Sequence, residues 1–290
     1  DKLRARLEHD APGAYRVELA MTYGEPSITA AMDKLRSENA HRLLVLPLYP
    51  QYSATTTASV FDAVTRKLQR VRWLPETRFI NHYHDAPAYI DALAASVRES
   101  WAEHGRGDHL LMSFHGVPQY TLDKGDPYFC FCSKTARLLS EALELGDDDW
   151  TMSFQSRVGR EEWLRPYTDE TVKELGSKGL GRLDVVCPGF ATDCLETIEE
   201  IAMQNAEFFT EAGGKSLHYI PALNARDDHV ELGSPDTEGR RHRPVVQIGQ
   251  FEHIAPHHRI AIQAIKHGLI VPATPPANQQ LRQRTSSVTP

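Results

Sequence analysis

The chain lacks the features that mark membrane and nucleic-acid-binding proteins. None of its apolar runs approaches the roughly 20 residues that a membrane-spanning helix needs, and no signal peptide opens the sequence. Its formal net charge of −7 is opposite in sign to that of a typical nucleic-acid-binding domain. We therefore expect a cytoplasmic protein with no nucleic-acid partner and no transmembrane segment. Peripheral contact with a membrane surface and the oligomeric state are left open.

Cysteine is scarce, and its spacing is not that of a zinc ribbon or a redox motif. The four cysteines include Cys130 and Cys132, which form a C-x-C pair. Cys187 and Cys194 lie far downstream, with six residues between them. We expect reduced, structural cysteines, with a metal or iron–sulfur site as the alternative.

An initial methionine is also absent. Asp1 instead lies in a charged amphipathic segment that extends to His9, as if the chain started partway through a helix. We interpret the sequence as a fragment of a longer protein.

Apolar runs typical of buried strands alternate with helical patterns through most of the chain. The expected strands are 15–20, 42–48, 77–80, 109–114, 150–154, 183–187 and 216–220. The expected helices are 27–37, 55–69, 86–104, 133–145, 168–178 and 193–211. Such alternation is typical of repeated βαβ units around a parallel sheet. It predicts an α/β protein made of two similar, doubly wound, Rossmann-like lobes.

Glycines at 105–107 divide the expected strands into two groups and set the predicted domain boundary. Residues 1–106 form the first lobe, which is one strand short, and residues 107–232 form the second. Residues 233–290 change in character, becoming turn-rich and then rich in Pro, Gln, Ser and Thr. This composition predicts a largely disordered tail of unknown origin. We interpret its histidines as solvated side chains, with a metal site as the alternative (His253, His257, His258 and His267).

His115 is the leading candidate for a catalytic side chain. It ends the buried run 110–114, and the chain then breaks at Gly116 and Pro118. Ligands of open α/β sheets bind beyond the carboxyl ends of the strands, where His115 is expected. The alternative is a histidine that only stabilises a turn.

Two further crossings from strand to helix carry large aromatic side chains. In segment 47–57, two prolines fix a loop from which Tyr49 and Tyr52 project, and Ser53 begins a run suited to helix capping. Such tyrosines suit the wall of a site for a flat apolar ligand. Trp163 lies in the long loop 154–168 beside several arginines, and it suits either ligand contact or the core.

The third crossing carries an acidic row. Asp193 and Glu196 have the spacing of a capping box. Glu196 and Glu200, at i and i+4, would share one face of the helix expected there. Because stacked like charges destabilise a helix, we favour a functional acidic row over capping and solvation alone.

These segments together resemble the ferrochelatase family. The run S-x-H-G-V-P at 113–118, continued through G-D-P-Y at 125–128, resembles the signature of that family. Segments 47–59, 154–170 and 187–200 resemble it in the same order, so the likeness extends over about 1–232. It implies the class II chelatase fold, with two lobes and a cleft between them.

The resemblance implies an enzyme that inserts ferrous iron into protoporphyrin IX, the last step of heme synthesis. Ferrous iron is then a substrate, no organic cofactor is needed, and an iron–sulfur cluster at Cys132 is not compelled by the spacing. The positions that match the family's catalytic and metal-contacting residues are His115 and Glu196. Imidazole suits acceptance of the two pyrrole protons, and with a carboxylate it can ligate the entering metal.

The resemblance also implies the roles of the surrounding residues. Asp193 and Glu200 would extend a relay of carboxylates for protons or metal ions. The substrate-binding positions would be Tyr23, Tyr52, Ser53 and Trp163. The matches at 154–170 and 187–200 resemble proteobacterial enzymes that use protoporphyrin, although a preference for coproporphyrin III stays open.

The chain departs from the family pattern in three places. The family's N-terminal strand is missing, Thr22 replaces an arginine of many relatives, and residues 233–290 match nothing in the family. These departures lead us to expect poor folding or weak porphyrin binding by this chain alone. The alternatives are a related class II chelatase for cobalt or nickel, and a non-catalytic porphyrin-binding protein.

Overall fold

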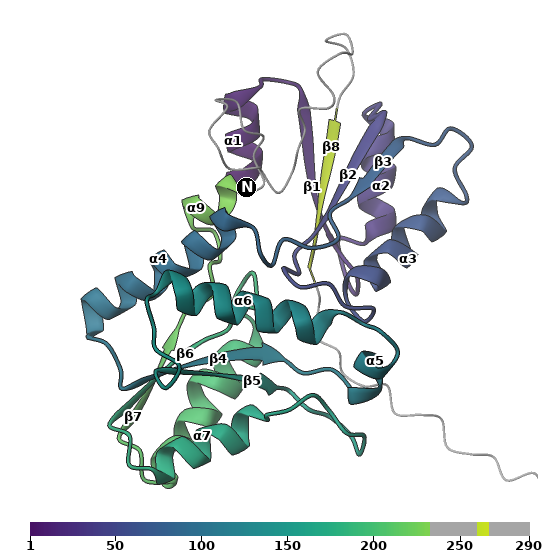
Figure 1. Ribbon diagram of the computed structural model, residues 1–290. Coiled ribbons are helices and arrows are strands. Elements are labelled where there is room, and N and C mark those ends of the chain that lie inside the picture. The colour runs from purple at the N-terminus through teal and green to yellow at the C-terminus, as the bar shows by residue number, and fades with distance from the viewer. Residues whose placement is uncertain (233–259, 267–290) are drawn as a thin grey trace, which may run out of the picture.

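Two parallel β-sheets organise the chain (Figure 1). The computed structural model describes residues 1–232 and 260–266. Each sheet has four strands and belongs to one α/β lobe. The seven strands expected from the sequence begin and end within one or two residues of their expected ranges, and β8 is an additional strand. The predicted α/β class is therefore confirmed.

The first sheet has the order β1-β8-β2-β3. Its members are β1 (Tyr15–Met21), β2 (Arg42–Pro47), β3 (Glu76–Phe79) and β8 (Ile260–Lys266). Strand β8 comes from far along the chain and pairs in parallel with β1 on one side and β2 on the other. Three helices accompany this sheet: α1 (Lys2–Asp10), α2 (Ile28–Ser37) and α3 (Thr57–Leu68).

The second sheet has the order β5-β4-β6-β7. Its members are β4 (His109–His115), β5 (Trp150–Gln155), β6 (Arg182–Val186) and β7 (Ser216–Ile220). Along β4, Leu110 and Met112 face one apolar cluster and Leu111 faces another. This alternation buries both faces of the sheet, as a central parallel strand requires.

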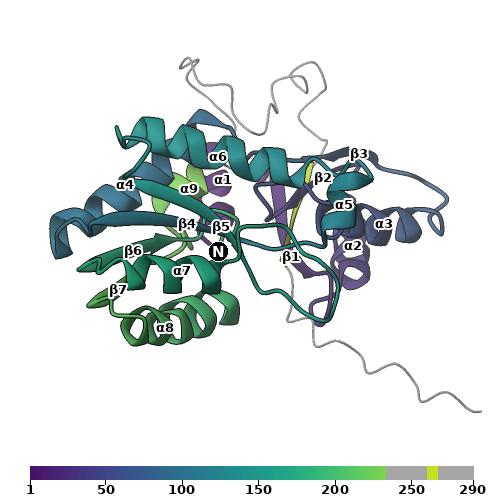
Figure 2. The same cartoon turned by 60° about the horizontal axis from the view of Figure 1, so that its bottom comes forward.

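Helices cover both faces of the second sheet (Figure 2). On one side lie α4 (Pro87–His104) and α6 (Tyr128–Ala142), and on the other α7 (Thr168–Ser177) and α8 (Ala206–Glu211). Short helices α5 (Gln119–Asp123) and α9 (Asp227–Glu231) complete the lobe, together with η1 (Glu196–Asn205). No helix of the described ranges is long and apolar enough to cross a membrane.

Helix α4 lies on the second sheet although it precedes the boundary expected at residue 106. Its Trp101 Nε1 donates a hydrogen bond of 2.8 Å to Asp184 Oδ2 on β6. Its Ser100 hydroxyl lies 2.9 Å from His218 Nε2 on β7. The predicted boundary therefore separates the strands of the two sheets, whereas α4 packs across it.

The segment expected to be a disordered tail contributes β8 to the first sheet. The rest of that segment, 233–259 and 267–290, lies outside the described residues, and so do the histidines predicted to be solvated there. At residues 260–266 the structure differs from the expectation, because the backbone pairs on both sides. A turn-rich composition around a short apolar run does not reveal such a distant pairing.

Asp126 ties the two lobes together. Its Oδ2 accepts hydrogen bonds from Ser53 Oγ at 3.0 Å and from the Ala54 amide at 2.7 Å, both in the first lobe. Its Oδ1 accepts the Tyr128 amide at 3.0 Å. That bond supports the first turn of α6, which begins at Tyr128 rather than at the expected residue 133. The buried carboxylate thus fixes a loop of one lobe to a helix of the other.

Candidate active site

The residues predicted to do chemistry lie beyond the carboxyl ends of parallel strands. Tyr23 follows β1, Tyr52 and Ser53 follow β2, and His115 is the last residue of β4. Trp163 lies in the loop after β5, and the acidic residues Asp193, Glu196 and Glu200 follow β6. This edge of an open α/β sheet is where ligands bind.

The ring of His115 is held in one tautomer by its neighbour. Nδ1 lies 2.7 Å from the carbonyl oxygen of Gly116. Because a carbonyl only accepts, Nδ1 must carry a proton, and in the neutral ring Nε2 then keeps its lone pair. The backbone is fixed as well, since the Tyr128 hydroxyl donates to the His115 carbonyl at 2.8 Å. His115 is half-buried and offers Nε2 as a base or a metal ligand.

Trp163 packs directly beside the His115 loop. A Cβ atom added at Gly116 would lie 3.0 Å from the indole ring and 2.8 Å from the Gln155 carbonyl oxygen. Glycine is required chiefly because the Gln155 backbone carbonyl lies so close, and the indole adds a second tight contact. The Trp163 Nε1 donates to the Val158 carbonyl at 2.9 Å, which fixes the ring orientation. The structure therefore places Trp163 against Gly116, the residue after His115, and the predicted contact of Trp163 with a substrate stays a prediction.

Glu196 begins a π-helix, not part of the α-helix expected over 193–211. The π-helical segment η1 extends to Asn205, and α8 follows it. The Asn205 side chain donates to the Glu200 carbonyl at 2.7 Å, five residues back, so a side chain enters the backbone ladder there. π-Helical turns are rare and frequently lie at functional sites.

The capping box expected at Asp193 and Glu196 is not formed. In a capping box the Glu196 carboxylate would accept the Asp193 amide. Here that amide donates to Asn224 Oδ1 at 2.9 Å instead, so the Glu196 carboxylate has a different partner. Burial raises the pKa of the Cys194 thiol to about 11, and a hydrogen bond to Glu196 adds to the effect. The protonated thiol thus supports the Glu196 carboxylate, which is half-buried.

Asp193 is a fully bonded carboxylate. Oδ1 accepts from the Tyr219 hydroxyl at 2.6 Å and from Thr197 Oγ1 at 3.1 Å, and Oδ2 accepts from Asn224 Nδ2 at 2.6 Å. It also lines a cavity of about 500 Å³ between the lobes, together with Leu46, Leu48, Tyr83 and His229. Neither His115 nor Glu196 lines that cavity. The predicted relay role of Asp193 stays a prediction.

Gln155 connects the His115 strand to the acidic helix. It is the register partner of His115 across β4 and β5. Its Nε2 donates to the Glu196 carbonyl at 2.8 Å and to Glu200 Oε2 at 3.3 Å. The Glu200 carboxylate is further held by the Ser156 amide at 2.7 Å and hydroxyl at 2.5 Å. The buried Gln155 amide, which also accepts from the Ser113 hydroxyl of β4 at 2.9 Å, thus bridges β4 and η1 from the end of β5.

Replacement of Gln155 by leucine is expected to lower the free energy of unfolding by about 1–3 kcal/mol, because the Ser113 hydroxyl and the Glu200 carboxylate each lose a buried partner. Urea denaturation of the purified chain measures this. Q155E should be at least as damaging, since it places a second carboxylate beside Glu200. Unfolding curves of Q155L and wild type that coincide would show that the amide does not hold η1.

Gln51 brings the first lobe close to His115. Gln51 Nε2 donates to the Pro188 carbonyl at 3.3 Å. A Cβ atom added at Gly189 would lie 3.7 Å from Gln51 Oε1 and 3.8 Å from the His115 amide nitrogen. Tyr23 is 52% exposed, and Tyr52 is half-buried. Ser53 is fully buried, and its hydroxyl donates a hydrogen bond to Asp126, which links the two lobes. The predicted contact of Ser53 with a substrate stays a prediction.

Sequence reasoning missed the neutral and linking residues of the site. Gln51, Asp126 and Gln155 all lie in segments that resemble the family, but no role was assigned to their side chains, and two of the three are uncharged. For Gln155, the available signal was its position at the end of a strand neighbouring β4. That signal identifies an edge of the sheet but not the bonds made across it.

Comparison with known proteins identifies the family. The family model described as Ferrochelatase matches residues 1–234. The ferrochelatase of Thioalkalivibrio sulfidiphilus is 58% identical over 226 residues, covering 78% of this chain and 61% of that protein. The ferrochelatase of Marinobacter nauticus is 56% identical over 215 residues, covering 74% of this chain and 58% of that protein. The chain thus spans about three fifths of the length of these relatives.

A solved structure supports the fold independently. SirB from Bacillus subtilis with Fe3+ superimposes with a TM-score of 0.54 at 15% sequence identity, covering 80% of this chain and 85% of that one. At this identity the likeness concerns the fold alone. With the family match over four fifths of its residues, the chain belongs to the ferrochelatase family.

Proposed function

We propose that this chain carries the catalytic residues of an enzyme that inserts ferrous iron into protoporphyrin IX to form protoheme. The observation that carries the proposal is the fixed ring of His115, whose Nδ1–H is bound to Gly116 and whose Nε2 lone pair is available. Family membership supports the choice of substrates.

Insertion exchanges two pyrrole protons for one metal ion. Fe²⁺ loses water ligands, binds the four porphyrin nitrogens and displaces two protons. His115 Nε2 accepts a pyrrole proton, which an imidazole can both take up and release near neutral pH. Glu196 takes part in the same exchange, either as a transient oxygen ligand for Fe²⁺ or as a second acceptor of a pyrrole proton. The Cys194 thiol supports its carboxylate through a hydrogen bond.

The surrounding residues receive supporting roles in this proposal. Glu200 and Asp193 continue from Glu196 as a relay that removes protons or supplies metal. The Trp163 indole, packed beside Gly116, forms a wall for the macrocycle, and Tyr23, Tyr52 and Ser53 contact it from the first lobe. The reaction as written needs no organic cofactor.

We also propose a cytoplasmic location and no nucleic-acid partner. All four cysteines are free thiols in the structure, which suits a reducing compartment. The net charge of −7 would repel a phosphate backbone.

Iron insertion by the purified full chain tests the proposal. Under anaerobic conditions with excess Fe²⁺, protoporphyrin fluorescence should fall as the absorption of protoheme appears. Formation of metallated product only with cobalt and a corrinoid precursor would favour a different chelatase. Porphyrin binding without any metallated product would favour a carrier, and either result would overturn the proposal.

A further inference from the structure

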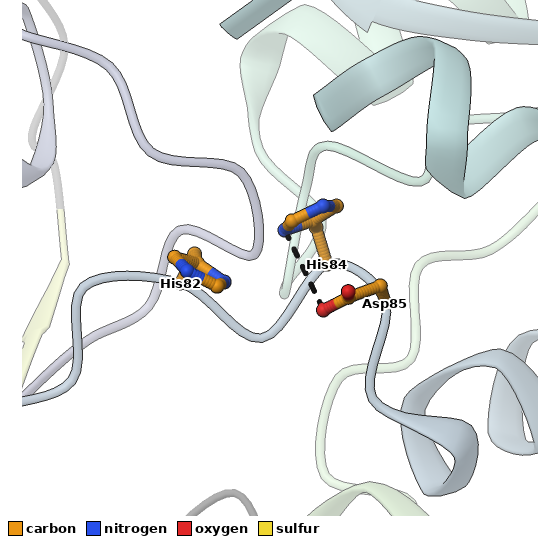
Figure 3. A group of neighbouring side chains, drawn as sticks. All are labelled: His82, His84 and Asp85. Atoms are coloured by element: carbon orange, nitrogen blue, oxygen red, sulfur yellow. Dashed lines mark ion pairs between the residues drawn. The ribbon is translucent and has the colours of Figure 1, made fainter. Parts of the chain in front are cut away.

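A second group of metal-ligating side chains lies in the loop between β3 and α4 (Figure 3). It comprises His82, His84 and Asp85, each of which offers one donor atom, and these atoms all lie within 4.8 Å of one another. His84 Nδ1 is 3.8 Å from Asp85 Oδ1, and the two imidazole centroids are 4.9 Å apart. None of these residues belongs to the His115 site.

Contacts with both lobes hold this loop in place. The Tyr83 amide donates to the Pro50 carbonyl of the first lobe at 2.9 Å. The Thr135 hydroxyl of α6 donates to the His84 carbonyl at 2.9 Å. The His84 ring stacks on Phe131 of α6 with a centroid distance of 3.9 Å and an interplanar angle of 12°. The donor atoms are therefore positioned before any ion arrives.

His84 has an unsatisfied hydrogen-bonding capacity that an ion would satisfy. The side chain is buried, and neither ring nitrogen has a hydrogen-bond partner among the described residues. Leaving a buried polar group unpaired costs about 1–3 kcal/mol, so such groups call for a reason. The nearest charged group is the Asp85 carboxylate, which is too distant for a hydrogen bond at 3.8 Å. A metal ion between them would contact both.

The donor set indicates the class of ion. Two imidazoles and one carboxylate suit Zn²⁺, Co²⁺ or Fe²⁺, whereas Ca²⁺ and Mg²⁺ prefer oxygen ligands. Lys134 Nζ already binds Asp85 Oδ2 at 2.6 Å and is nearly half exposed. It leaves Oδ1 for the ion but adds a competing positive charge nearby.

We propose that His82, His84 and Asp85 form a second site, apart from His115 and Glu196, for a divalent first-row transition-metal ion. All three ligands come from the same loop, and the His84 ring is the one buried against α6. Water completes the coordination on the exposed side of His82. The site stands on its own donor atoms and does not depend on porphyrin metallation.

Equilibrium dialysis of the full chain against Co²⁺ tests the site, with the Co²⁺ absorption spectrum as a second readout. Because other histidines and the His115 site also bind metal, the result is the difference between matched variants. H82A and D85N should each lose one bound equivalent or weaken it by more than about tenfold, since even outer-shell losses cost 10–100-fold. H9A, which removes an exposed histidine on α1, should match wild type.

Two further variants sharpen the experiment. H84F keeps the stack on Phe131 and removes both ring nitrogens, so it should lose the same equivalent as H82A. K134Q releases Asp85 and should bind Co²⁺ more tightly than wild type. If H82A and D85N retain the wild-type stoichiometry and affinity, or if K134Q does not bind more tightly, the proposed site is wrong. Because iron insertion is measured separately, failure of either proposal leaves the other intact.

Discussion

Replacement of His115 by alanine is expected to lower kcat for iron insertion by about 10²–10⁴-fold, the usual contribution of a general acid or base. The reason is local, because in the proposed function the Nε2 lone pair is the group that accepts the pyrrole proton. The loss should fall on kcat, with porphyrin affinity changed little, since the proposed function assigns the contacts with the macrocycle to Trp163 and the first lobe. Steady-state kinetics with protoporphyrin and Fe²⁺ separate these parameters.

His109 provides a matched control on the same strand. It lies at the opposite end of β4, where its Nε2 is 2.8 Å from Thr151 Oγ1, and H109Q should keep wild-type turnover. If H115A retained more than about a tenth of the wild-type kcat, His115 would not be the proton acceptor. A loss shared equally by H109Q would point to damage of the strand instead.

Removal of strand β8 is expected to produce the largest loss of stability. Among the described strands, β1 pairs with β8 alone, and β2 pairs with β8 along its whole length. A chain that ends at Leu232 would leave the buried edge of β2 unpaired and detach β1 from the sheet. Each orphaned buried backbone group costs about 1–3 kcal/mol, so the first lobe should lose cooperative folding.

Hydrogen exchange locates this effect along the chain. In the chain ending at Leu232, the amides of β1 and β2 should exchange rapidly, while those of β4 and β6 keep their protection. A chain ending at Lys266 retains β8 and should match the full chain, which makes it the control for truncation itself. Equal protection of β1 in both truncated chains would show that β8 does not hold the first sheet.

The regular elements could be predicted because burial leaves a periodic trace in the sequence. The run Leu110–Phe114 is apolar throughout because both faces of β4 are covered, and it ends where Gly116 admits the indole of Trp163. The start of α6 was harder to predict from the sequence. It depends on a carboxylate, Asp126, that also binds the other lobe.

The chemistry-bearing residues could be predicted by type, but their connections could not. The sequence placed His115 at the end of a strand and Glu196 after another. It could not show which imidazole nitrogen is free, because that depends on one carbonyl oxygen at 2.7 Å. The π-helix and the role of Gln155 were equally hidden, because they arise from hydrogen bonds such as Asn205 to Glu200 and Gln155 to Glu196.

The central claim is that His115 presents an unprotonated Nε2 as the proton acceptor of the site. Nitrogen-15 NMR of the histidine rings in the full chain at neutral pH tests this directly, with H115A assigning the signal. We predict that the neutral ring carries its proton on Nδ1 and that Nε2 shows the shift of a free lone pair. A neutral ring protonated on Nε2 would contradict the account.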